Sequence, residues 1–174
     1  LWHTRNYFMF SFWNAGIRFT DLAFLRWENI VDGRLVYEMG KNRKQKNIKL
    51  LPQALEILKH YKSDDRNGFI FPILPQQEMT EFGYRKKAAS KNVIINRHLK
   101  EIANKAGIQM NVSFHISRHS FARWADNSDA MDRKTIMNAL AHSKMSTTER
   151  YLDSFNEYRL DEGMRKLAES RNKG

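Results

Sequence analysis

Hydrophobic residues recur at every third or fourth position along most of the chain, which predicts helices that bury one face. In the first such segment, residues 3–14, Met9, Phe10 and Trp13 fall at helical spacing. The same spacing predicts further helices at residues 21–27, 54–61, 80–106 (with a break near 88–92), 132–140 and 156–174. Thr20 and Asp132 are expected N-caps, because their side-chain oxygens can accept free backbone N–H groups.

A different pattern fills the interval between the second and third helices. Asp32-Gly33 separates two short runs of β-prone residues, which is the signature of a tight hairpin. A further run follows a basic segment, so strands are expected near residues 29–32, 34–40 and 46–51. The predicted fold class is therefore mainly α with a small three-stranded antiparallel β-sheet.

Composition fits a single folded domain over residues 1–174, because 41% of the residues are hydrophobic. Lys and Arg number 30 against 19 Asp and Glu, which gives a net charge of +11. This excess favours a polyanionic partner, with nucleic acid as the first candidate. An anionic membrane surface is a weaker candidate, since the sequence has neither a long apolar run nor a basic amphipathic terminal helix.

Cysteine usage and the first residues bear on the cellular setting. The sequence has no cysteine, which excludes disulfides and thiolate metal sites and fits a reducing cytoplasm. The chain begins at Leu1 in an apolar and aromatic run, without a methionine and without a signal-peptide layout. We therefore expect a cytoplasmic protein and a sequence cut from a longer chain.

The stretch from Leu140 to Tyr151 carries the most informative chemistry. It sets His142 nine residues before Tyr151, and Ser146 to Glu149 has the capping-box spacing that begins a short helix. A tyrosine hydroxyl, with a free pKa of about 10, becomes a useful nucleophile only where cations stabilise the developing charge. A surface helix whose tyrosine ring packs on the core explains this stretch equally well.

Candidate cations lie elsewhere in the chain. Arg18 falls in the turn between the first two helices, where an ordinary surface pair with Asp21 is the alternative explanation. His115 and Arg118 are three residues apart, so on a helix they share one face and can converge on one ligand.

Two basic segments suit contact with a nucleic-acid backbone, although a solvated charged surface is the plainer interpretation. One is the hairpin at residues 41–49, where five of nine residues are basic, and the other is the helical region at residues 85–105. The residues expected to contact DNA are Arg43, Lys44, Lys46, Arg85, Lys86, Lys87, Lys91 and Arg97.

Four motifs occur in a fixed order along the chain. They are Gly-x-Arg-x-x-Asp (Gly16, Arg18, Asp21), a hairpin lysine (Lys41), His-x-x-Arg (His115, Arg118) and a histidine nine residues before a tyrosine (His142, Tyr151). In this combination the chain resembles the catalytic domain of the tyrosine recombinases, the integrase family of phages and conjugative elements. The resemblance covers about residues 3–165, and its main departure is Ala141 in Leu140-Ala-His-Ser, where the family has glycine.

The resemblance implies a catalytic set of Arg18, Lys41, His115, Arg118, His142 and Tyr151, with no metal and no cofactor. Tyr151 would attack a DNA phosphodiester to form a 3′-phosphotyrosine link. The two arginines and His142 would stabilise the charge on the non-bridging oxygens. His115 would act as general base and phosphate ligand, Lys41 would protonate the leaving 5′-oxygen, and Asp21 would orient Arg18.

The resemblance also implies a partner and an assembly. The expected function is site-specific cleavage and rejoining of double-stranded DNA, independent of metal and ATP, by a homotetramer on DNA in the bacterial cytoplasm. The helix at residues 156–174 is expected to be exchanged between protomers, and a separate N-terminal DNA-binding domain is expected outside this sequence. The alternatives are relaxation of DNA in the manner of a type IB topoisomerase, and a non-catalytic DNA-binding module on the same fold.

Overall fold

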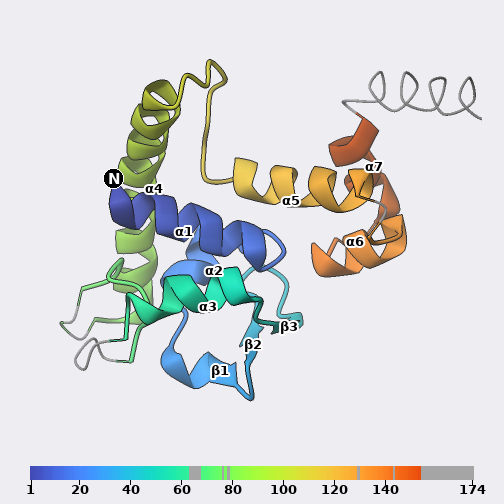
Figure 1. Ribbon diagram of the computed structural model, residues 1–174. Helices are drawn as coiled ribbons and strands as arrows, with labels where there is room; N and C mark the ends of the chain where they lie inside the picture. Colours follow the sequence, from blue (N-terminus) through green and yellow to red (C-terminus); the bar gives the residue numbers. More distant parts are fainter. Residues whose placement is uncertain (63–67, 76, 78, 129, 143, 154–174) are drawn as a thin grey trace, which may run out of the picture. The chain divides into compact units, whose positions relative to one another are not determined.

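The computed structural model describes residues 1–174 except 63–67, 76, 78, 129, 143 and 154–174 (Figure 1). The chain divides into two compact units, Leu1–Phe121 and Ala122–Gly174. The first unit contains α1 (Trp2–Trp13), α2 (Phe19–Ala23), a short 3-10 turn (Trp27–Asn29), β1 (Ile30–Val31), β2 (Arg34–Glu38), β3 (Gln45–Lys49), α3 (Pro52–Lys59) and α4 (Glu81–Lys105). Helix α5 (Ile116–Asn127) begins in the first unit and ends in the second.

The core of the first unit is an aromatic cluster. Phe71 packs edge to face against Tyr7, Phe10 and Tyr61, with ring centroids 5.3, 5.1 and 4.9 Å away. These side chains come from α1, from the segment after α3 and from the turn that precedes α4, so one cluster joins segments far apart in the sequence. Helix α1 contacts both α3 and α4 (Figure 1).

The sheet has the predicted class and topology. The strands are antiparallel in the order β1-β2-β3, and Val31 pairs with Arg34 across the two-residue turn. Asp32 and Gly33 both have positive φ angles, 49° and 70°, as the tight hairpin requires. The prediction of a mainly helical protein with one small three-stranded sheet is confirmed.

Three details of the predicted helices in this unit are wrong. The second helix begins at Phe19 rather than after a Thr20 cap, because this start buries Phe19 and Leu22. It ends at Ala23, and the chain then extends to form an isolated bridge between Arg26 and Phe69. Helix α4 has no break near residues 88–92, since it contains no Pro or Gly after Gly83 and buries one continuous stripe.

The described part of the second unit contains α6 (Arg133–Ala139) and α7 (Met145–Asp153), which pack against each other. Asp132 caps α6 as predicted, since its Oδ1 accepts the N–H of Thr135 at 2.6 Å. Helix α7 begins at Met145, so Ser146 lies inside the helix and is not its cap. The helix predicted at residues 156–174 lies outside the described residues.

None of the described helices is both long enough and apolar enough to cross a membrane.

Candidate active site

Arg18 is presented by a tight turn that follows α1. Ala15 and Gly16 both have positive φ angles, 59° and 67°, which turn the chain back on the end of the helix. The Ser11 carbonyl accepts the N–H of Gly16 at 2.8 Å, and the Ser11 hydroxyl donates to the carbonyl of Ile17 at 2.8 Å. The turn is thus fastened to α1 from both sides, immediately before Arg18.

Arg118 approaches the same turn from α5. Its Nη1 donates to the Gly16 carbonyl at 3.0 Å, and the residue is only 3% exposed. The backbones are so close that a Cβ on Gly16 would lie 2.6 Å from the Arg118 Cα. A second link joins the hydroxyls of Ser11 and Ser117 at 2.7 Å. The structure therefore brings the two predicted arginine segments together.

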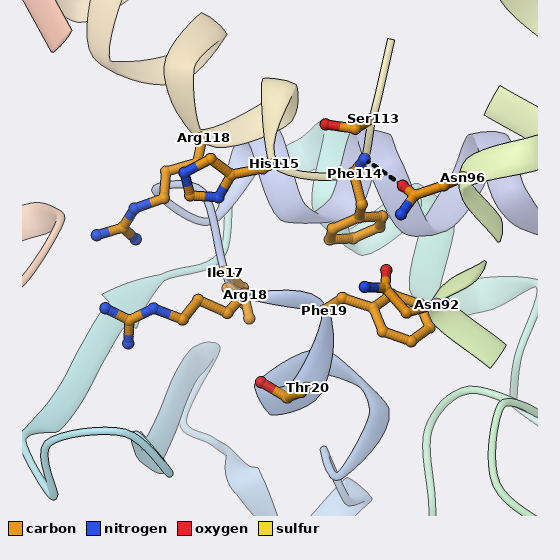
Figure 2. A pocket seen from close by; sticks show the side chains of 10 residues that line it. All are labelled: Ile17, Arg18, Phe19, Thr20, Asn92, Asn96, Ser113, Phe114, His115 and Arg118. Carbon is orange, nitrogen blue, oxygen red and sulfur yellow. Dashed lines mark hydrogen bonds between the residues drawn. The ribbon is translucent and has the colours of Figure 1, made fainter. Parts of the chain in front are cut away.

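A cavity of about 240 Å³ lies beside the two arginines (Figure 2). Its lining residues are Ile17, Arg18, Phe19, Thr20, Asn92, Asn96, Ser113, Phe114, His115 and Arg118. Figure 2 shows the His115 ring above the Arg18 side chain. The guanidinium groups of Arg18 and Arg118 extend to the same side of the view. Asn96 Oδ1 accepts the N–H of Phe114 at 2.7 Å and so fixes the backbone immediately before His115.

His115 is neutral at pH 7 in this environment. Partial burial of its ring, followed by the charges of His119 and Arg118, lowers the pKa of His115 to about 4, although the residue as a whole is exposed. The His119 ring lies edge-on to it, with centroids 4.7 Å apart. A neutral imidazole offers one nitrogen that donates and one that accepts.

Asp21 connects the Arg18 segment with the β2–β3 hairpin. Its Oδ1 accepts the N–H of Gly40 at 3.0 Å, and its Oδ2 lies 3.9 Å from Arg18 Nη1. Burial raises the pKa of this carboxyl, while the Gly40 hydrogen bond and the charge of Arg18 lower it. The Arg18–Asp21 ion pair considered in the sequence analysis is therefore present. It is not a surface ion pair, because the Asp21 side chain is only 5% exposed.

The basic residues of the hairpin separate into two groups. Lys41, Arg43 and Lys44 are exposed at its tip, where Arg43 forms an ion pair with Glu38 at 2.8 Å. Lys46 is buried on the inner face of β3, with 7% of its surface exposed.

Helix α4 carries the other basic residues predicted to contact DNA. Of these, Arg85, Lys86, Lys87 and Arg97 are exposed, and Lys91 is half-buried.

His142 and Tyr151 belong to the second unit. His142 Nδ1 is hydrogen-bonded to the buried Thr148 hydroxyl at 3.0 Å, which orients the imidazole from the first turn of α7. Tyr151 lies in α7, as predicted for an ordered helix, and its side chain is not among those described. Ala141 has a φ of 51°, the left-handed conformation that glycine adopts without strain, which explains the glycine expected here.

Sequence reasoning missed the residues that hold the site together. Nothing in the sequence marks Ser11, Ser117 or Asn96, because isolated polar residues give no pattern until their partners are known. Lys46 did carry a signal, since it lies two residues before Ile48 and so shares the inward face of a strand. Among the described residues, no group of three or more His, Cys, Asp and Glu side chains is placed to hold a metal ion.

The sequence profile described as the phage integrase family matches residues 2–157. The tyrosine recombinase XerC of Xylella fastidiosa strain M23 is 27% identical over 141 residues, covering 80% of this chain and 45% of that protein. The tyrosine recombinase XerC of Chlamydia caviae is 26% identical over 142 residues, covering 80% and 44%. The chain thus spans less than half the length of these curated relatives.

Solved structures show the same fold. The XerA recombinase matches with a TM-score of 0.66 at 20% identity, covering 95% of this chain and 62% of that chain. XerH in a post-cleavage complex with a palindromic difH substrate has a TM-score of 0.67 at 20% identity and covers 92% and 44%. A lambda integrase tetramer bound to a Holliday junction has a TM-score of 0.57 at 20% identity and covers 86% and 42%.

We expect Gly16→Ala to lower the free energy of unfolding by about 2–4 kcal/mol, because a left-handed residue gains a Cβ that also collides with α5. Urea denaturation measures this loss. The matched control is Gly33→Ala, which has the same positive φ but no atom within 4 Å of the added Cβ. That variant should lose only about 1–2 kcal/mol. Equal losses in the two variants would contradict the close contact between Gly16 and Arg118.

Proposed function

Because the chain belongs to the phage integrase family, we propose that it acts as a site-specific DNA recombinase that cleaves and rejoins strands through a 3′-phosphotyrosine intermediate. The observation that carries this proposal is the hydrogen bond from Arg118 to the Gly16 carbonyl, which keeps the Arg118 segment next to the Arg18 segment beside one cavity. Two guanidinium groups held in this way suit a phosphodiester better than they suit a neutral ligand.

The arginines stabilise the charge that develops during attack. A phosphodiester under nucleophilic attack becomes a dianionic pentacoordinate species, and each guanidinium can donate a pair of hydrogen bonds to its non-bridging oxygens. This electrostatic stabilisation replaces the divalent cations that other phosphoryl-transfer enzymes use. Asp21 acts as a positioning residue, because it contacts both Arg18 and the backbone that leads into Lys41.

The second unit contributes the nucleophile. Tyr151 attacks phosphorus, the bond to the 5′-oxygen breaks, and a phosphotyrosine diester forms at the 3′-end. His142 donates a hydrogen bond to the non-bridging oxygens through Nε2, while its Nδ1 is held by Thr148. The reaction exchanges one phosphodiester for another, so a second strand is joined by the reverse steps without ATP.

Proton transfer is assigned to two further residues. His115, neutral at pH 7, accepts the proton of the Tyr151 hydroxyl and contacts the phosphate. Lys41, at the exposed tip of the hairpin, donates a proton to the leaving 5′-oxygen, and the flexible stem of a lysine suits this role. The remaining exposed lysines and arginines of the hairpin and α4 contact the DNA backbone on either side.

The proposed partner is double-stranded DNA and the proposed assembly is a homotetramer, like the lambda integrase tetramer on a Holliday junction that this fold resembles. We place the protein in the bacterial cytoplasm, bound to DNA when active. Exchange of strands between two duplexes supports recombination, whereas relaxation of a single supercoiled plasmid without exchange would favour a topoisomerase. DNA binding without any cleavage would favour a non-catalytic module.

We expect Tyr151→Phe to abolish covalent attachment to a nicked duplex and to leave folding and DNA binding intact, because only the attacking oxygen is removed. The adduct is detected on a denaturing gel with labelled DNA and located by peptide mapping. Arg18→Ala and Arg118→Ala should instead slow its formation by roughly a hundredfold or more. An adduct that persists in Tyr151→Phe, or that maps to Tyr158, would overturn the assignment of the nucleophile.

We expect Lys41→Ala to slow cleavage of an ordinary substrate by roughly a hundredfold or more. A substrate with sulfur in place of the bridging 5′-oxygen should be cleaved at nearly the wild-type rate, because a thiolate leaves without protonation. Single-turnover rates on the two substrates measure this difference. If both substrates slow equally, Lys41 only positions the DNA and Lys44 becomes the next candidate for the acid.

We expect binding to duplex DNA to weaken roughly tenfold or more between about 50 and 200 mM salt, because Lys and Arg side chains displace counterions from phosphates. Replacing Lys86 and Lys87 with Ala should reduce the slope of log affinity against log salt by about two. Lys59→Ala on α3 is the matched control, since Lys59 is exposed but paired with Glu56. A flat salt dependence in the parent protein would contradict phosphate contacts as the source of binding.

A further inference from the structure

A second cavity, of about 530 Å³, is formed in the first unit by α2, the β2–β3 hairpin and the start of α4. Its lining residues are Thr20, Asp21, Phe24, Leu25, Arg26, Glu28, Asn29, Tyr37, Glu38, Gly40, Lys41, Arg43, Glu81 and Arg85. Thr20 lines this cavity and also the one beside the arginines, so the two cavities are neighbours. Lys41, to which the proposed function assigns protonation of the leaving 5′-oxygen, lines the second cavity and not the first.

The two cavities differ in charge. The first is lined by Arg18 and Arg118 and by no carboxylate, so it suits an anion. The second is lined by four basic residues and by four acidic ones, namely Arg26, Lys41, Arg43 and Arg85, and Asp21, Glu28, Glu38 and Glu81. Because these charges balance, the second cavity suits a neutral polar group better than a second phosphate. Its volume lies in the range of small-molecule sites.

The lining of the second cavity combines aromatic surface with hydrogen-bonding groups of both kinds. Phe24 is half-buried and packs edge to face against Tyr84, with ring centroids 6.3 Å apart. Arg43 is paired with Glu38 at 2.8 Å, and Arg85 with Glu81 at 2.7 Å.

Glu28 is exposed and belongs to no ion pair among the described residues, so its carboxylate is available as an acceptor. An aromatic face together with donors and acceptors is what binds an unstacked nucleobase.

We propose that the second cavity binds the base of the nucleotide that carries the leaving 5′-oxygen, and that it thereby retains the end of the cleaved strand. The inference rests on the proposed function, since it takes Lys41 to be the acid for that oxygen. A lysine in the lining that reaches the 5′-oxygen places the same nucleotide at the cavity. Phe24 stacks on its base, and Glu28 accepts a hydrogen bond from its amino group.

Cleavage makes this capture easier. The nucleotide becomes the end of a strand and is stacked on one side only, so unstacking costs less than it does inside an intact duplex. The base then holds the 5′-hydroxyl close to the phosphotyrosine. The cavity should therefore act on rejoining, the step in which a strand with a free 5′-hydroxyl enters the site.

Rejoining reverses the cleavage reaction. The 5′-oxygen attacks phosphorus, the bond to the Tyr151 oxygen breaks, and a DNA phosphodiester is restored. Lys41, left neutral by cleavage, takes the proton of the 5′-hydroxyl, and His115 returns its proton to the tyrosine. Base binding in the cavity contributes to capture of the strand and not to these bond changes. Its loss should raise the half-saturating concentration of the incoming strand and leave the maximal rate unchanged.

The test uses the full-length protein and a nicked duplex that carries the recombination site, recovered by sequencing DNA trapped covalently on wild-type protein. The adduct is formed first, and the short fragment beyond the nick diffuses away. Strands with a free 5′-hydroxyl are then added over a range of concentrations, and the rate of rejoining is measured. One strand is complete, and the other has an abasic first nucleotide, which keeps the hydroxyl and removes only the base.

We expect the abasic first nucleotide to raise the half-saturating concentration about tenfold with wild-type protein. Phe24→Leu, which removes the ring, should raise it about tenfold for the complete strand and no further for the abasic strand. This lack of additivity is the signature of direct contact between the two groups. Glu28→Ala, at an exposed position, should raise it roughly fivefold for the complete strand alone. Thermal unfolding verifies that each variant is folded.

Two controls separate the cavity from the duplex. Phe82→Leu changes an exposed phenylalanine of α4 that lines neither cavity, so it should leave the tenfold effect of the abasic nucleotide unchanged. An abasic residue in the opposite strand removes the pairing partner of the first base, and it should not raise the half-saturating concentration.

The proposal is overturned if the effects of Phe24→Leu and the abasic nucleotide add, or if the opposite abasic residue weakens capture as much as loss of the base itself. Additive effects would favour a peptide segment of a partner protein as the occupant, since it too suits a cavity of balanced charge. Failure of the proposed function would appear earlier, because no adduct on Tyr151 would form and no rejoining could be measured.

Discussion

The close approach of Gly16 to α5 is the constraint on which the placement of Arg18 and Arg118 in the first unit depends. The turn after α1 and the first turn of α5 are about a hundred residues apart in sequence, and they meet through the Arg118 to Gly16 hydrogen bond and the pair of serine hydroxyls. With no Cβ at position 16, the two backbones touch. The Arg118 side chain and the backbone that leads into Arg18 are thereby held in place, so a ligand would not have to order them.

The same arrangement concentrates positive charge where a folded protein ordinarily avoids it. Arg118 and Lys46 are buried and Arg18 is largely so, while Asp21 is a carboxylate near both arginines and also holds the Gly40 backbone. Such a cluster costs stability in the free protein, because buried like charges repel and lose hydration. In the proposed reaction this cost would be offset, because the charges that stabilise a dianionic transition state would already be in place.

Most helices and strands were predicted from turn, capping and periodicity patterns of neighbouring residues. These predictions were wrong where packing against residues distant in sequence decided the structure. Asp32-Gly33 fixed the hairpin and Asp132 fixed the start of α6, because each acts on its own backbone neighbours. Thr20 did not cap α2, because the helix begins one residue earlier, at Phe19, whose side chain is buried. The two compact units also mean that the predicted catalytic residues divide, with Arg18, Lys41, His115 and Arg118 in the first and His142 and Tyr151 in the second.

The sequence by itself determined the fold class, the family and the identity of the candidate catalytic residues, because periodicity, turn chemistry and motif order are properties of neighbouring residues. Only the tertiary structure decided which polar residues support them. Asn96, Ser11 and Ser117 acquire a role from partners as much as 106 residues away, which no local pattern encodes. It also separated Lys46 from its exposed neighbours, because burial and the charges of two distant arginines depend on how the segments pack together.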